Sequence, residues 1–267
     1  MNNADLYAKS HTIQFEVNAE ILQQFDYLVN WDKFVKIKLL DIGCGDGDFL
    51  VNVLLKKLDN RCEVLGVDIF QDMVDIAAKK FGSMPNVKFT KFDITAIDLS
   101  ELLKSGPFNL ITSFVCLNWV RNQRQAFVNI YQLLAKEGQL FCTFVRNDAL
   151  KLVYQELAKD PRWSPFMTDW NDFTAPYVDV EDWRQVLGEH LKVAGFTDFR
   201  MEVSHGPYHF RSEQELKDML HSVNPFALRI PEELEVKYVK DLLKEFQRQS
   251  KSPVKYPYEM IILYASK

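Results

Sequence analysis

Basic residues, paired cysteines and long apolar runs are all scarce in this chain of 267 residues. Its 32 lysines and arginines are outnumbered by 37 aspartates and glutamates, which gives a net charge of -5 at pH 7. Nucleic-acid-binding proteins gain much of their affinity from basic surfaces that neutralise phosphates. The charge balance therefore argues against a nucleic-acid partner.

Cysteine and histidine occur without the spacing of a metal site. The four cysteines form no C-x-x-C pair, and the five histidines fall in no ligand pattern. These residues are Cys44, Cys62, Cys116, Cys142, His11, His190, His205, His209 and His221. We expect reduced thiols and no bound metal.

The first residues lack the basic cap and apolar run of a signal peptide, and no later apolar run is long enough to span a bilayer. We therefore expect a cytoplasmic protein without stable membrane insertion. A content of 47% hydrophobic and 26% charged residues is typical of a globular chain. Its length fits one domain with insertions, so we expect a single domain over residues 1–267.

Short apolar segments alternate with helical stretches through the first half of the chain. The strand candidates are residues 36–42, 63–68, 86–93, 108–115 and 138–145. Helices are expected after Gly47, from Gln71 and from Arg124. This alternation is typical of an α/β fold in which crossover helices connect the strands of a parallel sheet.

The remaining segments flank this core of residues 36–146. Residues 1–35 form a lead-in with an amphipathic helix over 17–31. Further helices are predicted near 148–159, 180–194, 212–223 and 231–249, with strands at 197–203 and 258–265. The two late strands suggest a hairpin-like sheet edge, and residues 147–178 and 210–250 are predicted to be cap insertions over a substrate.

The strongest local motif is LLDIGCGDGDFL, residues 39–50, in which an apolar strand enters a glycine-dense turn. Gly43 and Gly45 allow a tight bend and a close approach to a ligand. The spacing is G-x-G-x-G, not the G-x-G-x-x-G of dinucleotide-binding proteins. Asp41, just before the glycines, can bind an ammonium group, and the following helix N-terminus can bind a carboxylate.

Two further acids follow the next two strands. Asp68 ends the strand VLGVD, where an α/β fold presents a carboxylate to ribose hydroxyls. Asp93 follows the third strand and can accept from the amine of adenine, with Ile69 and Ile94 over the faces of the ring. Because all three acids follow carboxyl ends of predicted parallel strands, they indicate one ligand edge that binds S-adenosylmethionine (SAM).

LDIGCGDG and the acids after it resemble the class I SAM-dependent methyltransferases over about residues 35–145. That resemblance implies a doubly wound, mostly parallel seven-stranded Rossmann-like sheet. The opening ADLY, Gln14 and the segment SFVCLNWV are similar to the insect juvenile hormone acid O-methyltransferases and their paralogues. In that family, the residues matching Gln14 and Trp119 are implied to hold the carboxylate of the acceptor. The residue before the tryptophan is often histidine in the family, so Asn118 departs from the pattern.

The donor groups of Trp119 and Gln14 also suit a carboxylate on chemical grounds. Alternatively, Trp119 is a core residue and Gln14 a surface residue of the lead-in. The aromatic stretch over residues 162–177, with Phe226, can line an apolar tunnel or simply pack a cap on a sheet. Its large apolar members are Trp163, Phe166, Met167, Trp170, Phe173 and Tyr177.

The resemblance implies an enzyme of juvenile hormone biosynthesis that converts farnesoic acid or juvenile hormone acid to its methyl ester. Transfer to an ionised acid needs no general base, and no base is evident beside Trp119. Two alternatives stay open: a methyltransferase for another small acid or an amine, and a non-catalytic paralogue that binds SAM or an isoprenoid.

Overall fold

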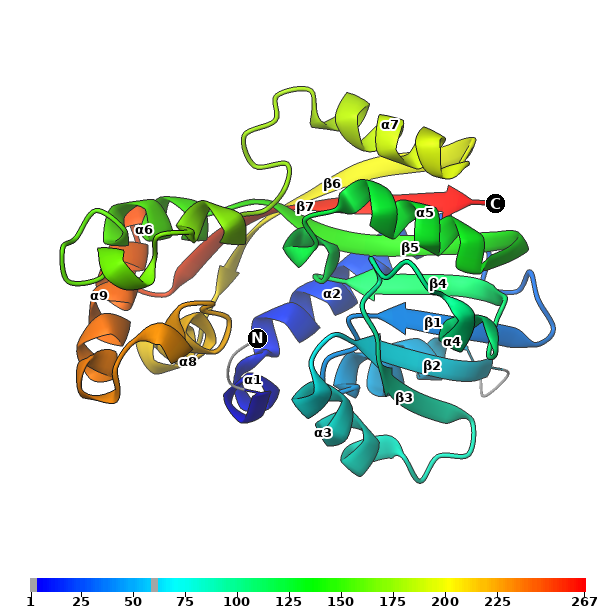
Figure 1. The fold of residues 1–267 in the computed structure, drawn as a ribbon, viewed down its shortest axis with the longest axis horizontal. Helices are drawn as coiled ribbons and strands as arrows, with labels where there is room; N and C mark the ends of the chain where they lie inside the picture. Colours follow the sequence, from blue (N-terminus) through cyan, green and yellow to red (C-terminus); the bar gives the residue numbers. More distant parts are fainter. Residues whose placement is uncertain (1–3, 59–61) are drawn as a thin grey trace. The chain divides into compact units, whose positions relative to one another are not determined.

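The computed structural model describes residues 4–58 and 62–267, and in this part of the chain the strands form one seven-stranded sheet (Figure 1). The strand order is β3-β2-β1-β4-β5-β7-β6. The strands are β1 (Ile37–Ile42), β2 (Cys62–Asp68), β3 (Val87–Lys91), β4 (Phe108–Phe114), β5 (Leu134–Asp148), β6 (Asp198–His209) and β7 (Lys255–Ser266).

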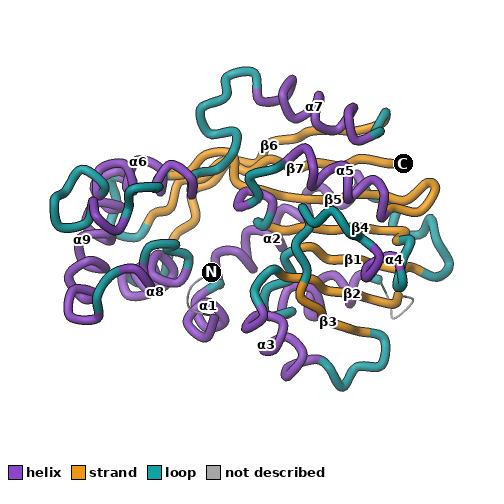
Figure 2. The backbone as a smooth tube through the Cα atoms, in the orientation of Figure 1, coloured by secondary structure: helices purple, strands orange, loops and turns teal. Residues whose placement is uncertain are grey.

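Helices connect the strands (Figure 2). The α-helices are α1 (Ala4–Ser10), α2 (Thr12–Phe25), α3 (Gln71–Phe81), α4 (Ser100–Leu103), α5 (Gln123–Leu133), α6 (Leu150–Leu157), α7 (Trp183–Ala194), α8 (Glu213–Ser222) and α9 (Glu232–Ser250). A π-helix, η2, spans Leu50–Leu55. Short 3-10 turns complete the elements: η1 (Asp26–Leu28), η3 (Leu117–Trp119), η4 (Ser164–Phe166), η5 (Trp170–Phe173) and η6 (Ala227–Arg229).

The chain order reverses between β1 and β4. From β1 it moves outward through β2 to β3, and it then returns to β4 on the other side of β1. The pairs β1–β2, β2–β3, β1–β4 and β4–β5 are all parallel. The carboxyl ends of these strands therefore share one edge, with a switch point between β1 and β4 where open α/β sheets bind ligands. The predicted α/β, doubly wound, mostly parallel fold is confirmed.

At the far side of the sheet, β7 lies between β5 and β6. Its arrowhead lies at the opposite end of the sheet from those of β1 and β4 (Figure 1). Because α8 and α9 separate β6 from β7 in sequence, the predicted late pair of strands with helices inserted between them is confirmed.

The chain divides into two compact units, which are described separately. The sheet unit contains Asn18–Phe144, Asp179–Val203 and Ile261–Lys267. The helical unit contains Met1–Val17, Val145–Val178 and Ser204–Met260. The segments 147–178 and 210–250, predicted as cap insertions, both fall within the helical unit. Their role as a cap and the assignment of the chain to one domain remain predictions.

In the helical unit, α6 packs on α9, and the aromatic segment contributes to its core. Trp163 is buried, donates from its indole nitrogen to Asp241 Oδ2 at 3.1 Å, and meets Tyr238 edge to face at 5.2 Å. Phe226 meets Tyr154 and Phe173 in the same way at 5.2 and 5.3 Å. The sequence allowed these aromatic residues either to line a tunnel or to pack a cap. The contacts of Trp163, Phe173 and Phe226 are those of a packed core.

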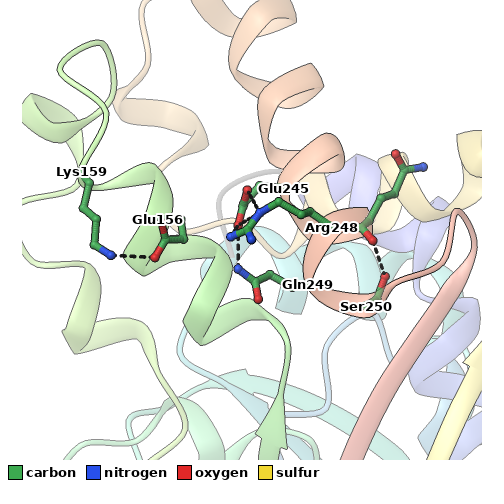
Figure 3. Close-up of polar contacts among 7 residues, drawn as sticks. Glu156, Lys159, Glu245, Arg248, Gln249 and Ser250 are labelled. Carbon is green, nitrogen blue, oxygen red and sulfur yellow. Dashed lines mark hydrogen bonds and ion pairs between the residues drawn. The ribbon is translucent and has the colours of Figure 1, made fainter.

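One face of α9 is charged. Glu245 binds Arg248 and the side-chain amide of Gln249 on the same helix, and Lys159 pairs with Glu156 of α6 (Figure 3). The opposite face of α9 is buried through Tyr238, Val239, Leu242, Leu243 and Phe246. This helix is amphipathic, and its charges form a solvated face.

Several sequence-based boundaries were wrong, including the end of β6, which was predicted at residue 203 and lies at His209. The amphipathic helix predicted over residues 17–31 lies at Thr12–Phe25 and continues as the 3-10 turn η1. The polar start forms a separate helix, α1, which has too few apolar positions for a clear period. Strand β5 starts at Leu134 instead of 138, because pairing with Phe108 of β4 recruits that residue despite a register shift.

Candidate active site

The chain leaves β1 through a bend with three glycines in left-handed backbone conformations. Gly43, Gly45 and Gly47 have φ angles of +75°, +56° and +78°, a region that non-glycine residues enter at a cost. A Cβ atom at Gly43 would lie 2.3 Å from the Cβ and Sγ atoms of Cys116. Conformation and close packing both require glycine at position 43.

Asp68, the last residue of β2, connects this bend to the next helix. Its Oδ2 accepts the N–H of Gly45 at 3.1 Å, and its Oδ1 accepts the N–H of Phe70 at 3.0 Å. The side chain is 6% exposed, and burial raises its pKa although the two backbone hydrogen bonds lower it. A carboxylate can accept about four hydrogen bonds, so Asp68 keeps capacity for further donors.

Asp41 lies inside the sheet beside Asp68. It is 4% exposed, and its Oδ1 accepts the hydroxyl of Thr112 on β4 at 2.7 Å. Burial, with a smaller contribution from the charge of Asp68, raises the pKa of Asp41 to about 7. Within residues 4–58 and 62–267, neither carboxylate forms an ion pair with a basic side chain. Two desolvated acids without a basic partner among those residues are typical of a ligand site.

The third acid lies in a more exposed turn after β3. Asp93 Oδ1 accepts the N–H and the hydroxyl of Thr95, both at 2.8 Å. Asn129 of α5 holds this turn by donating to the carbonyl oxygens of Ile94 and Ala96 at 2.6 and 2.8 Å. Ile94 is buried in the protein, whereas Ile69 is 49% exposed. Of the two isoleucines, Ile69 has the larger surface to offer a ligand.

The turn after β4 carries Trp119 and packs on the glycine bend through Cys116. Val115 begins this turn with a φ of +52°, which is strained for a β-branched residue. The N–H of Val115 donates to the carbonyl oxygen of Thr143 at 2.9 Å. Gln123 of α5 donates to the carbonyl oxygens of Leu117 and Val120, both at 2.6 Å. These bonds keep the strained backbone in one conformation.

Trp119 and Asn118 share a hydrogen bond in this turn. The Asn118 amide satisfies both its groups when Nδ2 donates to Val115 O at 3.2 Å and Oδ1 accepts from Trp119 Nε1 at 2.9 Å. Asn118 is 8% exposed, whereas Trp119 is 45% exposed. Trp119 is therefore a surface residue and not the core residue that the alternative interpretation requires.

Gln14 belongs to the helical unit, and the other predicted site residues belong to the sheet unit. It lies in α2, and its buried Oε1 has no hydrogen-bond partner within residues 4–58 and 62–267. A buried amide oxygen without a partner is unusual in a folded protein. Such an atom indicates a place where a ligand or solvent donor belongs.

Sequence reasoning missed several polar residues that position the site. Thr112, Gln123 and Asn129 are buried, and each hydrogen-bonds to a site residue or to its turn. Asn129 falls on the buried side of a predicted helix, which is the signal that could have identified it. Within the described residues, no group of three potential ligands could hold a metal ion, and the four cysteines form no disulfide. No helix in those residues is both long and apolar enough to cross a membrane.

Known proteins are similar to this chain in sequence. Residues 40–140, which contain the glycine bend and all three acids, match the family described as "Methyltransferase domain". The chain is 30% identical to the juvenile hormone acid O-methyltransferase of Drosophila melanogaster, in an alignment that covers 100% of this chain and 93% of the relative. The chain belongs to this family of O-methyltransferases. A second member, from Bombyx mori, is 29% identical, with 100% and 98% of the two chains aligned.

The protein is a SAM-dependent O-methyltransferase, as its family and methyltransferase domain show. Among solved structures, the YcgJ protein of Bacillus subtilis matches 96% of this methyltransferase and 99% of its own chain, with a TM-score of 0.57 at 14% identity. At that identity the likeness shows the fold alone. Membership of this family, together with the methyltransferase domain, confirms the predicted enzyme class and cofactor.

Proposed function

We propose that this methyltransferase esterifies the carboxylate of an apolar isoprenoid acid, with farnesoic acid or juvenile hormone acid as the best candidates. The observation that carries the proposal is the full-length similarity to enzymes named for juvenile hormone acid. The absence of a cationic partner for Asp41 and Asp68 in the described residues supports a bound SAM at this edge of the sheet.

The residues of the sheet edge fit the parts of SAM. Asp41 is buried and can bind the ammonium group of the methionyl part, and Asp68 can accept from the ribose hydroxyls. The methionyl carboxylate would lie at the helix N-terminus that follows the bend, because the N–H groups of Gly43 and Gly45 already donate to Val67 O and Asp68 Oδ2. Asp93 and the two neighbouring isoleucines, Ile69 and Ile94, would contact adenine. When bound, SAM supplies an activated methyl group on a positively charged sulfur.

The chain's remaining task is to orient the acceptor and to exclude water. A carboxylic acid with a pKa of roughly 4–5 is ionised at neutral pH, so no side chain has to remove a proton. Gln14 and Trp119 would orient the carboxylate through their N–H groups. Alignment of reactants can lower a barrier by about 7–11 kcal/mol, which makes positioning the main contribution of these residues.

Methyl transfer from labelled SAM to a panel of fatty acids, isoprenoid acids and matching amines tests the proposal. We expect methyl esters of isoprenoid acids. Product with amines alone would contradict the carboxylate proposal. Binding of S-adenosylhomocysteine without any product would indicate a non-catalytic paralogue.

Variants then test the acceptor residues. We expect Gln14→Ala and Trp119→Phe each to lower kcat/KM for the acid by roughly tenfold or more, as expected for lost hydrogen bonds to a charged group. The Kd for S-adenosylhomocysteine should stay unchanged in both. Gln24→Ala, at an exposed position of the same helix α2, is the matched control for Gln14. Full activity in both test variants would refute these roles.

A further inference from the structure

The indole N–H of Trp119 already has a partner within the chain. Asn118 Oδ1 accepts it at 2.9 Å, and the same amide donates to Val115 O at 3.2 Å. The reverse orientation of the amide would face its oxygen to a carbonyl and its NH₂ to the indole N–H. Both contacts would then be repulsive, so the surroundings determine which way this amide points.

The surrounding turn leaves Asn118 little freedom to move away. Asn118 is buried, Leu117 and Val120 are bound by Gln123, and the strained Val115 is bound by Thr143. Trp119, in contrast, exposes nearly half of its surface. The turn therefore presents the ring of Trp119 outward while its N–H is bound to Asn118.

We propose that Asn118 is a specificity-determining positioning residue that withholds the Trp119 N–H from the acceptor. An acceptor carboxylate can reach this donor only by displacing Asn118 Oδ1, which then loses its partner. An indole has a single donor, so the two acceptors compete directly. This inference rests on the proposed role of Trp119 and adds that Asn118 weakens the capture of carboxylates.

Two substitutions at position 118 separate this competition from structural support of the turn. Asn118→Leu removes both the acceptor for Trp119 and the donor to Val115. Asn118→Asp also removes the donor to Val115 but keeps an oxygen that accepts the indole N–H more strongly. With farnesoic acid as the probe, we expect KM for the acid to fall by roughly tenfold in the leucine variant. In Asn118→Asp, KM for the acid should rise. KM for SAM should stay within about twofold of the native value in both variants.

Asn122→Ser is the matched control, because serine keeps the N-cap of α5 that Asn122 provides. Its KM values should equal those of the native protein. A shift of the acid KM in the same direction in both Asn118 variants would mean that the residue only supports the turn, which would overturn the proposal.

The indole resonance of Trp119 provides a readout that does not depend on turnover. In ¹⁵N-labelled protein, the Trp119 signal is assigned by its loss in Trp119→Phe. We expect its N–H proton to move upfield, and to exchange faster with water, in Asn118→Leu but not in Asn118→Asp. An unmoved signal in the leucine variant would refute the hydrogen bond. If no acid is methylated by the native protein, the proposed function fails, and this spectrum still decides the position of Asn118.

Discussion

Asp41 and Asp68 show how a buried carboxylate acquires a function. Asp41 lies in β1 and Asp68 ends β2, so folding buries both carboxylates in the sheet. Among the described residues, no basic side chain forms an ion pair with either of them. For Asp41, burial raises the pKa to about 7 from 3.8. The folded protein therefore binds a proton at a pH where the unfolded chain has released it. A ligand ammonium beside Asp41 would restore the ionised form.

The pH dependence of stability follows from this shift. The stabilisation that protonated Asp41 contributes is fully present below about pH 4 and is lost as the pH rises to about 7. The amide in Asp41→Asn does not titrate, so we expect the free energy of unfolding of this variant not to fall in the same way as the pH rises. Urea unfolding between pH 4 and 7.5 should show the native free energy of unfolding falling relative to the variant by on the order of a few kcal/mol. Parallel curves for the two proteins would contradict the assignment.

At the scale of elements, helix α3 is bound to the glycine bend at both of its ends. Before its first turn, the N–H of Phe70 donates to Asp68, which also accepts from Gly45. In its last turn, Lys80 binds the buried carboxylate of Asp46. The helix therefore positions the bend through two separate contacts, one of which is an ion pair.

Removal of Lys80 should loosen the bend without disturbing the acceptor residues. Lys80→Met removes the Lys80 ammonium from the buried Asp46 carboxylate, and the loss of one member of a buried ion pair is costly. We expect the Kd for S-adenosylhomocysteine, measured by calorimetry, to rise roughly tenfold while KM for the acid changes little. Lys79→Met, at an exposed neighbouring position, is the control. Equal affinities in the two variants would show that the ion pair does not position the bend.

At the scale of the whole molecule, the aromatic core and the predicted SAM-binding residues belong to different compact units. The aromatic core of Trp163, Tyr238, Tyr154 and Phe226 lies within the helical unit. The glycine bend, Asp41, Asp68 and Asp93 lie within the sheet unit. A substitution in the aromatic core of the helical unit should therefore change the affinity of the sheet unit for SAM little.

Trp163→Ala tests this separation. Truncation of a buried tryptophan typically costs about 3–5 kcal/mol, and here it also leaves Asp241 without its indole donor. We expect a lower Tm in thermal unfolding, with the Kd for S-adenosylhomocysteine within about twofold of the native value. The half-buried Trp170, changed to alanine, should lower Tm less. A large loss of affinity in Trp163→Ala would show that the two units are coupled.

Local sequence determined the parts of this protein that depend on neighbours along the chain. Alternating apolar strands and helices predicted the α/β class, in agreement with the structure. The G-x-G-x-G motif predicted a tight bend after β1, where the structure has three left-handed glycines. The three acids could be predicted to share an edge because parallel strands align their carboxyl ends. Gly47 marked the end of the bend, but nothing in the pattern distinguished the π-helix at Leu50–Leu55 from an α-helix.

Tertiary structure alone decided how the polar groups of the site pair. Thr112 meets Asp41 across 71 residues of sequence, and Lys80 meets Asp46 across 34, separations at which no local pattern operates. The pKa of Asp41 depends on burial by distant strands, which composition does not reveal. The bond between Asn118 and Trp119 joins sequence neighbours, and the same amide also donates to Val115 O in the turn that follows β4. Residue types and the succession of strands and helices along the chain are local properties, whereas desolvation and hydrogen bonds between distant residues arise only when distant segments pack together.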